Sequence, residues 1–352
     1  MTATTKRTIG RVSSLCLGAV LLLALMAAAA APWGTARAKQ ADDDSIVLAV
    51  EFNSHAACAH VARHQGWYEA QGIRLRSYDS YVTGMALAAA LMRGEVDAAY
   101  LCLIPAVNVY ANGRVPLKVV AGTHRYGYAM VVDPEKIGSV KDLERPGLRI
   151  GCSSEGSPTD AIVHRTIDTN GLNERSVMGN VLRMNPPKQL LALKMGQLDA
   201  AVVPEQYPGM AEELGFKVLV RAQDLWPGMQ GSVLVVTDEL IRTRPGVVKK
   251  LVEITESSTR WITEHPKESS AIIASMLNGS QGGGSREEAA KLNSRFTVSP
   301  EVVLRSFEKG LEYRTDIDPD QIDATIAYMA KLGYIRKGFD SSAILDLGWL
   351  NR

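Results

Sequence analysis

Two stretches of the chain repeat one pattern of apolar and polar positions. Residues 88–106 are AAALMRGEVDAAYLCLIPA and residues 190–208 are LLALKMGQLDAAVVPEQYP. In each, the end of an apolar helix is followed by a glycine, an Asp-Ala-Ala step, a short apolar run and a proline. A glycine just past a helix supplies the left-handed position that ends it, and the apolar run is typical of a strand buried on both faces. The two copies lie about a hundred residues apart, which indicates two similar lobes.

Strands and helices alternate around both stretches, and this order is typical of parallel sheets with helices on both faces. Besides the two apolar runs after Asp-Ala, strands are expected at 46–50, 117–121, 128–132, 148–151, 181–184, 216–220 and 231–236, and a further strand starts at 73–75 and has its carboxyl end at 81–84. Helices are expected at 56–69, 84–93, 105–112, 158–170, 207–214 and 245–265, with a further one opening at Asn185. The stretch 278–285 (NGSQGGGS) predicts a loop, and apolar residues at helical spacing predict a helical tail after Pro300.

The first 38 residues have the pattern of a secretory signal peptide. Three basic residues precede an apolar run from Leu15 to Ala31, and Ala36-Arg37-Ala38 is a small-x-small cleavage site. We expect cleavage after about Ala38 and export to the periplasm; an uncleaved membrane anchor is the alternative. No other stretch is apolar and long enough to span a membrane.

Composition and charge exclude some classes of function. Apolar residues make up 46% and charged residues 22%, as in an ordinary globular protein. The whole chain has a net charge of +1, and residues 1–38 carry four basic and no acidic side chains, so the mature chain carries −3. That charge argues against a nucleic-acid binder. Any attraction of anions would have to come from a local site.

The cysteine content leaves two possibilities open. Cys16 leaves with the signal peptide, and Cys58, Cys102 and Cys152 remain. Three cysteines in an oxidising compartment allow at most one disulfide and leave at least one free thiol. They could instead bind a soft metal together with nearby histidines. Buried small hydrophobic side chains are the simpler interpretation, and we expect no metal and no cofactor.

An ordered set of motifs resembles one family of solute-binding proteins. The motifs are GEVDAA (94–99) with Pro105-Ala106, IGSVKDL (137–143), GLRIG (147–151) leading to Gly156-Ser157, and GQLDA (196–200) leading to Glu205-Gln206-Tyr207. In this order the chain resembles the type II periplasmic binding proteins of ABC importers. More narrowly, it is similar to their nitrate/sulfonate/taurine, NMT1/THI5-like branch.

The resemblance implies a fold and a role. The fold is α/β with two lobes, each a mainly parallel sheet flanked by helices, joined by two crossing segments and followed by a helical C-terminal extension. Lobe 1 would comprise 43–130 and 231–352, and lobe 2 would comprise 131–230. A monomer of this kind would capture a small organic solute, anionic (sulfonate- or carboxylate-like) or heterocyclic, between its lobes. It would then present the solute to permease and ATPase subunits.

Candidate ligand-binding residues follow from this fold, because ligands of parallel sheets bind beyond the carboxyl ends of the strands. Several of these ends precede helices, whose free N–H groups suit an anion. The best such cradle is Ser153–Ser157. The candidates are Asn53, Ser54, His55, Thr83, Gly84, Cys102, His124, Ser153, Ser154, Gly156, Ser157, Asn185 and Glu205.

Further side chains could shape the cleft. Arg125, Arg183 and Lys188 are basic residues that could face an anion, and Tyr126 and Trp226 could wall a planar ligand. The two repeats diverge at Cys102-Leu103 and Glu205-Gln206. A Cys-Leu pair makes one wall softer and less polar than a nitrate or sulfonate site requires. We therefore expect specificity to be set at these two strand ends.

Two other functions remain open. An enzyme of the pyrimidine-synthase type shares this fold and uses cysteines and a lysine-bound cofactor. The predicted export and the absence of a cysteine cluster argue against it, and the chain has no G-x-S-x-G, H-E-x-x-H or phosphate-loop motif. The second alternative is a ligand-sensing ectodomain that signals to a membrane partner, which sequence patterns do not distinguish from an importer subunit.

Overall fold

The computed structural model describes residues 45–279 and 296–350. The expected signal peptide with Cys16, and residues 280–285 of the expected loop, lie outside the described residues. Within the described ranges, no helix has the length and apolar character needed to cross a lipid bilayer.

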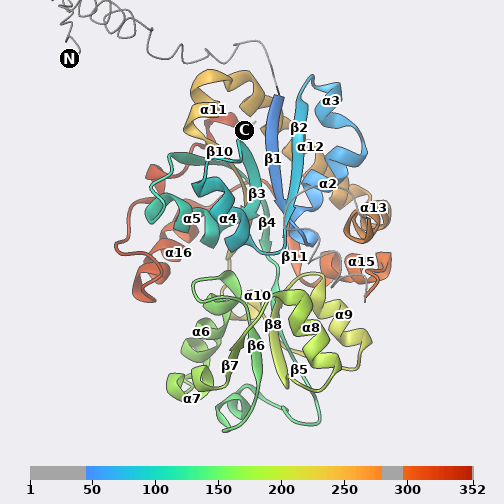
Figure 1. Ribbon diagram of the computed structural model, residues 1–352, viewed down its shortest axis with the longest axis vertical. Coiled ribbons are helices and arrows are strands. Elements are labelled where there is room, and N and C mark those ends of the chain that lie inside the picture. Colours follow the sequence, from blue (N-terminus) through green and yellow to red (C-terminus); the bar gives the residue numbers. More distant parts are fainter. Residues whose placement is uncertain (1–44, 280–295, 351–352) are drawn as a thin grey trace, which may run out of the picture. The chain divides into compact units, whose positions relative to one another are not determined.

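The first sheet has six strands in the order β11-β4-β10-β3-β1-β2 (Figure 1). Strand β1 runs parallel to β2 and β3, whereas β10 runs antiparallel to β3 and β4, and β11 antiparallel to β4. The strands are β1 (Ser45–Glu51), β2 (Arg74–Tyr81), β3 (Ala98–Cys102), β4 (Leu117–Tyr126), β10 (Gln230–Thr237) and β11 (Leu311–Tyr313).

The second sheet has five strands in the order β7-β6-β8-β5-β9. Strand β6 runs parallel to β7 and β8, whereas β5 runs antiparallel to β8 and β9. The strands are β5 (Tyr128–Val132), β6 (Ile150–Cys152), β7 (Val181–Arg183), β8 (Ala200–Pro204) and β9 (Lys217–Arg221). The expected α/β fold is confirmed, with antiparallel strands in both sheets.

The antiparallel strands β5 and β10 stand where the chain crosses between sheets. Strand β4 leads through Gly127 directly into β5, and the chain returns through residues 226–229 into β10. Gly127 has φ +97°, and a Cβ there would collide with His55 Nε2, so this crossing requires glycine. All of β5 pairs in the second sheet, so the lobe boundary expected at residue 130 falls inside a strand.

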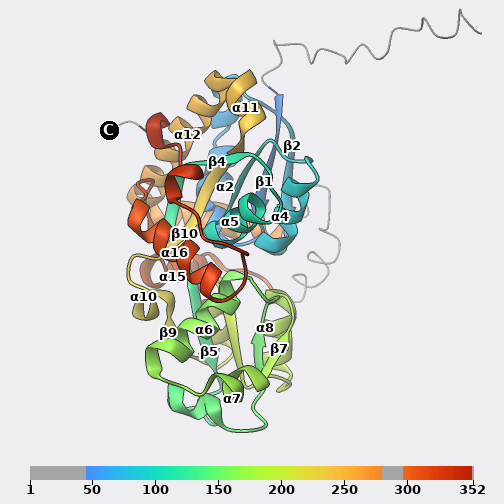
Figure 2. The same ribbon diagram turned by 90° about the vertical axis from the view of Figure 1, so that its left-hand side faces the viewer.

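Helices cover both sheets (Figures 1 and 2). Around the first sheet these are α2 (Ala57–His64), α3 (Trp67–Ala70), α4 (Gly84–Met92), α5 (Leu103–Ala111), α11 (Asp238–Thr243), α12 (Pro245–Glu264), α13 (Pro266–Asn278), α15 (Pro300–Lys309) and α16 (Pro319–Lys331). Around the second they are α6 (Pro158–Asn170), α7 (Glu174–Gly179), α8 (Pro186–Lys194), α9 (Tyr207–Glu213) and α10 (Ala222–Leu225). Successive residues of β1, such as Val47 and Leu48, enter different core clusters, so this strand is buried on both faces.

One expected helix differs from the structure, and one expected strand is found at the edge of its sheet. The helix expected at 56–69 divides into a 3-10 turn (Ser54–Ala56), α2 and α3, because Gly66 adopts φ +69° and interrupts the helix. The strand expected to start at 73–75, with its carboxyl end at 81–84, is β2, which runs from Arg74 to Tyr81. Strand β2 lies at the edge of its sheet and is partly exposed, which accounts for its polar residues.

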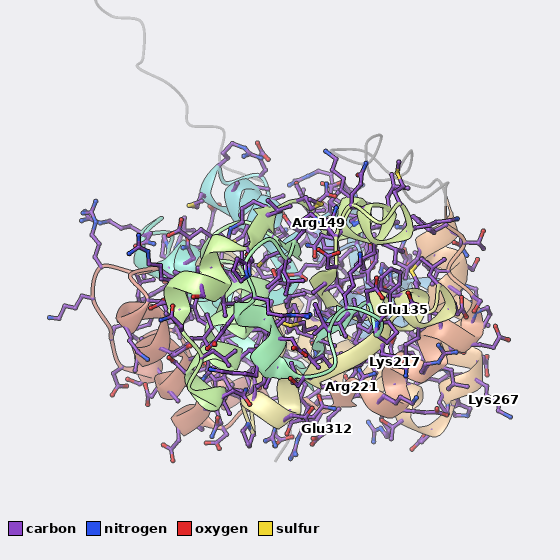
Figure 3. All side chains as sticks on the ribbon, turned by 90° about the horizontal axis from the view of Figure 1, so that it is seen from below. Glu135, Arg149, Lys217, Arg221, Lys267 and Glu312 are labelled. Atoms are coloured by element: carbon purple, nitrogen blue, oxygen red, sulfur yellow. The ribbon has the colours of Figure 1, made fainter. Side chains whose placement is uncertain are left out.

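The repeated aspartates make the same connection in both sheets. The N–H of Asp97 donates to the carbonyl of Val47 (3.0 Å), and the N–H of Val47 donates back to Asp97 Oδ2 (2.8 Å). Asp199 exchanges the same pair of hydrogen bonds with Arg149, both at 2.9 Å (Arg149 is labelled in Figure 3). The Asp-Ala-Ala motif is therefore a structural brace that holds the start of one strand to its parallel neighbour.

Candidate functional site

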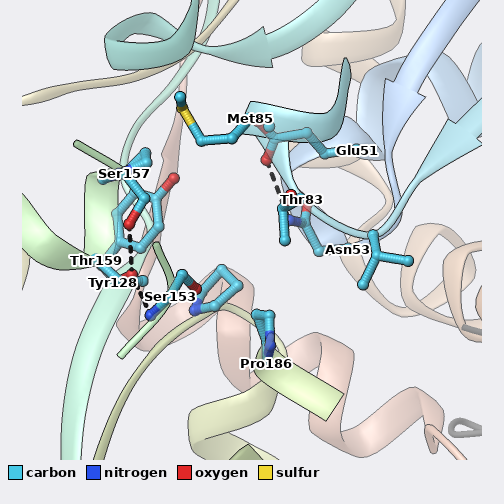
Figure 4. Close-up of a pocket in the computed structure, with 13 residues that line it drawn as sticks. Glu51, Asn53, Thr83, Met85, Tyr128, Ser153, Ser157, Thr159 and Pro186 are labelled. Carbon is cyan, nitrogen blue, oxygen red and sulfur yellow. Dashed lines mark hydrogen bonds between the residues drawn. The ribbon is translucent and has the colours of Figure 1, made fainter. Parts of the chain in front are cut away.

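A cavity of about 30 Å³ lies between residues of the two sheets (Figure 4). A cavity of this volume admits a few water molecules, so a larger solute requires the two sides to move apart. Glu51, Asn53, Val82, Thr83, Gly84 and Met85 line it from the first sheet's side. Tyr128, Ser153, Ser157, Pro158, Thr159, Pro186 and Pro204 line it from the second sheet's side.

Three helices begin at this cavity. The side chain of Thr83 caps α4, that of Ser157 caps α6 and that of Asn185 caps α8, each accepting a backbone N–H of the first turn. Each helix presents the positive end of its dipole at its first residues. The cavity therefore lies where partial positive charges from both sheets' helices converge.

Glu51 is the one ionisable carboxyl group among the residues that line the cavity, and it was not among the expected site residues. It ends β1 and is 3% exposed. Its Oε1 accepts the N–H of Cys102 (2.9 Å), and its Oε2 accepts the side-chain amide of Asn53 (3.2 Å). Burial raises the pKa of Glu51, and these two hydrogen bonds partly offset that rise.

Two neighbouring histidines lie behind Glu51. The rings of His55 and His124 are 4.6 Å apart, and both side chains are buried. His55 Nε2 donates to the carbonyl of Gly127 (2.7 Å), and its Nδ1 lies 3.8 Å from Glu51 Oε2. Burial lowers the pKa of His55 to about 4 and that of His124 well below its usual value. Both imidazoles are therefore neutral at pH 7, and His55 ties the cavity's first side to the crossing residue.

A buried aspartate supports the wall on the second side. Asp160 accepts the N–H of Gly156 (3.1 Å) and the hydroxyl of Tyr334 (2.5 Å) through Oδ2, while its Oδ1 accepts Arg183 (2.6 Å). Tyr334 follows α16, so the C-terminal tail holds the 156–157 loop in place. Because Arg183 pairs with this buried aspartate, its charge is already compensated.

Glu205 lies in a second set of contacts, away from the cavity lining. It is 2% exposed, and its Oε1 accepts Arg221 (2.7 Å; labelled in Figure 3). Burial raises the pKa of Glu205 to about 7, against the opposing effect of Arg221. The neighbouring Gln206 accepts both the backbone N–H and the hydroxyl of Ser54, at 2.9 and 3.0 Å. These residues join the two sheets beside the cavity.

The structure brings five of the thirteen expected residues to the cavity: Asn53, Thr83, Gly84, Ser153 and Ser157. Ser154 is exposed and outside the lining. The others stand behind or beside the lining, as cap, hinge or support: Ser54, His55, Cys102, His124, Gly156, Asn185 and Glu205. Where a helix follows a strand end, its N-cap or first residues line the cavity, as at Thr83, Gly84 and Ser157.

The other side chains considered from the sequence do not line the cavity. Arg125 lies 3.8 Å from Asp316. The ring of Trp226 packs under Arg165, whose guanidinium carbon is 4.1 Å from the ring centroid. The lining contains no lysine, arginine or histidine. Any attraction of the cavity for an anion would have to come from the helix N-termini and from neutral donors such as the Ser153 and Ser157 hydroxyls.

The three described cysteines are buried free thiols. Burial raises the pKa of Cys58, Cys102 and Cys152 to about 12, so the protonated forms dominate at neutral pH. Among the residues that the structure describes, no group of three or more His, Cys, Asp and Glu side chains is placed to hold a metal ion. The cysteines thus behave as small buried hydrophobic side chains.

The sequence contains a signal for two cavity residues that were not expected there, Glu51 and Tyr128. Glu51 follows the apolar run 46–50 directly, and a carboxyl at the end of a strand buried on both faces needs a partner or a function. Tyr128 opens the apolar run that follows the first crossing. Its position in the cavity depends on which sheet that run joins: the boundary expected at residue 130 placed Tyr128 in lobe 1, whereas β5 pairs in the second sheet.

Comparison with known proteins gives one family and a common fold. The family described as NMT1-like matches residues 39–278. No curated protein matches the sequence. The alkanesulfonate-binding protein SsuA from Xanthomonas axonopodis pv. citri, bound to MOPS, is 16% identical, with a TM-score of 0.69 over 87% of this chain and 99% of that chain.

Two further structures agree with this assignment. The periplasmic nitrate-binding protein NrtA from Synechocystis PCC 6803 is 13% identical, with a TM-score of 0.69 over 86% of this chain and 85% of that chain. A zinc-bound ligand-binding component of an ABC-type import system from Staphylococcus aureus is 16% identical, with a TM-score of 0.68 over 87% and 97%. At these identities the likeness shows the periplasmic-binding-protein fold alone. With the family match over most of its length, the chain belongs to the NMT1-like family.

Proposed function

We propose that this chain is the extracytoplasmic solute-binding subunit of an ABC importer. It captures a small organic solute between two lobes and delivers it to permease and ATPase subunits at the membrane. The observation that carries this proposal is a cavity lined from both sheets, which the chain joins at two crossings, Gly127 and residues 226–229. Two bodies joined in this way can open to admit a solute and close over it.

In this proposal the lobes follow the sheets. Lobe 1 contains β1–β4, β10 and β11 with their helices, and lobe 2 contains β5–β9. The tail after α16 also reaches lobe 2 through Tyr334 and Asp160. The predicted signal peptide supports export to the periplasm, where the protein would work as a monomer.

The lining favours binding over catalysis. It contains no lysine and no cysteine, the groups on which an enzyme of the pyrimidine-synthase type would depend. Cys102 lies just behind the lining, but burial raises its pKa to about 12, so its nucleophilic thiolate form is scarce. A sensing ectodomain would use the same cavity, and only the membrane partner separates that role from transport.

The solutes named for similar proteins do not transfer directly. An oxyanion such as a sulfonate or nitrate would meet the helix N-termini favourably. It would also meet Glu51, whose ionised form repels it. Zinc would need a ligand cluster, and the described residues hold none. We therefore place the solute among small polar organic compounds with an apolar part.

A solute panel tests the proposed role. Thermal unfolding of the purified protein would be followed with sulfonates, carboxylates, amines, amidines, heterocycles, nitrate and Zn²⁺. A specific solute at about a hundred times its Kd stabilises the folded state by about 2.7 kcal/mol. Stabilisation by a small organic solute supports the proposal, whereas a response to Zn²⁺ alone, or to no compound, contradicts it.

A second measurement separates transport from sensing. The loaded protein would be added to vesicles carrying the permease and ATPase encoded beside it. An importer subunit raises ATP hydrolysis only when its solute is bound. A loaded protein that leaves ATP hydrolysis unchanged but alters the activity of a neighbouring sensor kinase would support the ectodomain alternative.

A further inference from the structure

The carboxyl group of Glu51 occupies the N-terminal ends of two helices. Gly84 is the first residue of α4, and a Cβ there would collide with Glu51 Oε1. Cys102 occupies the N-cap position of α5, and its backbone N–H donates to the same oxygen (2.9 Å). Free N–H groups and a positive dipole end make such a place an anion site. On the first side of the cavity, the chain fills this anion site with its own carboxylate.

The groups around Glu51 leave its charge without a cationic partner. His55 Nδ1 lies 3.8 Å away from the 3-10 turn, and its ring is neutral because burial lowers its pKa to about 4. Because His55 Nε2 donates to Gly127, its Nδ1 faces Glu51 as a second acceptor. The Cys102 thiol of β3 and the Tyr128 hydroxyl of β5 are also near Glu51. Both have a raised pKa and are neutral. From α4 and α6 the lining contributes hydroxyl, thioether and apolar groups.

The carboxylate retains capacity to accept hydrogen bonds. Each oxygen has two lone pairs, and Cys102 and Asn53 use one on each oxygen. A buried carboxylate is stabilised strongly by a donor that carries positive charge. The remaining lone pairs of Glu51 therefore have no donor from the described part of the protein. A solute in the cavity could supply one.

We propose that Glu51 selects the solute: the cavity takes a compact organic compound that presents a cationic or N–H-donating nitrogen to Glu51, and it rejects free oxyanions. This inference rests on the proposed solute-binding function. The class comprises amines, amidines and N–H heterocycles. Met85 and Pro186 offer apolar contacts to the rest of such a solute, and Ser153 and Ser157 offer hydroxyls on the opposite side.

Matched pairs of probes test the selection. Acetamidine and acetate have nearly the same shape but opposite charge, as do benzamidine and benzoate. Their affinities would be measured calorimetrically at pH 8 for the wild type, Glu51→Gln and the control Glu135→Gln, which alters an exposed carboxyl remote from the cavity lining. We expect the wild type to bind the amidines about tenfold or more tightly than the acids. Glu51→Gln should remove that preference, and Glu135→Gln should keep it.

Three results would overturn the selection by Glu51. The first is that the wild type binds the acids as tightly as the amidines. The second is that Glu51→Gln retains the preference for amidines. The third is that the wild type binds neither amidine. The wider solute panel separates a failure of the inference about Glu51 from a failure of the proposed function. If another solute of that panel stabilises the protein while no amidine does, the inference about Glu51 fails and the proposed function stands. If nothing stabilises it, both fail.

A rescue experiment tests the anion site without any solute. Glu51→Ala removes the carboxyl and leaves the N-termini of α4 and α5 facing the space. We expect acetate or formate to raise the unfolding temperature of Glu51→Ala and to leave that of the wild type unchanged. A rise of equal size in both proteins, or none in the variant, contradicts the occupation of an anion site by Glu51. Should Glu51→Ala fail to fold without added anion, refolding with acetate but not with acetamide gives the same answer.

Discussion

The backbone N–H of Cys102 donates to Glu51 Oε1 across 2.9 Å, which joins the last residue of β1 to the N-cap of α5. The contact satisfies a helix N-terminus that would otherwise be open to an anion. It also fixes a buried carboxyl in the wall of the cavity. One hydrogen bond thus connects the sheet geometry of the first lobe with the chemistry that a solute would meet.

Glu205 should make the protein less stable as the pH rises from about 4.5 to 7. Its pKa is raised from 4.5 to about 7 in the folded state, so over this range the folded protein holds a proton that the unfolded chain has lost. The contribution is about 3 kcal/mol. Urea unfolding at several pH values should show that Glu205→Gln loses this slope. A slope equal to that of the wild type would mean that Arg221 keeps Glu205 ionised throughout.

His55 should act in the opposite direction. Its pKa falls from 6.5 to about 4 on folding, so the unfolded chain binds the proton first and stability falls as the pH drops through this window. The loss is about 3 kcal/mol. His55→Gln keeps a donor for the Gly127 carbonyl and removes the titration. The free energy of unfolding of this variant, relative to the wild type, should therefore increase between pH 6.5 and 4; no relative change would contradict a buried neutral imidazole.

The two aspartate braces should stabilise different sheets. Arg149 and Lys136 contribute to holding the pKa of Asp199 at about 2, so its stabilisation is lost as the pH falls from 3.8 to 2. The partners are partly exposed, and we expect Asp199→Asn to cost about 1–2 kcal/mol after solvent screening.

Hydrogen exchange localises these effects. Asp199→Asn should speed exchange of the Arg149 amide, and the matched Asp97→Asn should speed that of the Val47 amide, because each carboxylate accepts that N–H. Exchange that quickens equally at both amides in either variant would show that the braces do not act separately.

Tyr334 should influence binding from outside the cavity. Tyr334→Phe removes a hydrogen bond to buried Asp160, at a cost of about 1–3 kcal/mol, and loosens the 156–157 loop of the cavity wall. Solute affinity should fall together with stability. Tyr328→Phe is the control, because the Tyr328 hydroxyl donates to Asp168 (3.0 Å) and neither residue lines the cavity. Equal losses of affinity in both variants would assign the effect to the tail in general.

Much of the fold could be predicted from the sequence because its signals are local. The apolar runs at 46–50 and 231–236 are buried strands, and the caps Thr83, Ser157 and Asn185 begin helices as their patterns indicate. The edge strand β2 shows an apolar pattern only at its start, because its exposed positions are polar. Local signals are weakest where burial is partial.

The site was less predictable because it depends on register and on tertiary contacts. Strand ends indicated where ligands bind, which placed Ser153 and Ser157 at the cavity. The sequence Ser157-Pro158 marks a helix start, but nothing local shows that Ser154, three residues earlier, is exposed. Glu51 was missed because it belongs to the strand itself, and its partner Cys102 lies 51 residues further along the chain.

Solute binding by the Ser157→Trp variant tests most directly whether the solute lies between the lobes. Ser157 is 3% exposed in a cavity of about 30 Å³, so an indole there would prevent closure, at a cost of about 1 kcal/mol for the lost helix cap. Ser154→Trp places the same side chain on the exposed part of the same loop. With the most stabilising solute of the panel, Ser157→Trp should unfold cooperatively but show no solute-dependent rise in unfolding temperature, and Ser154→Trp should respond like the wild type. A wild-type response from Ser157→Trp would contradict binding in this cavity.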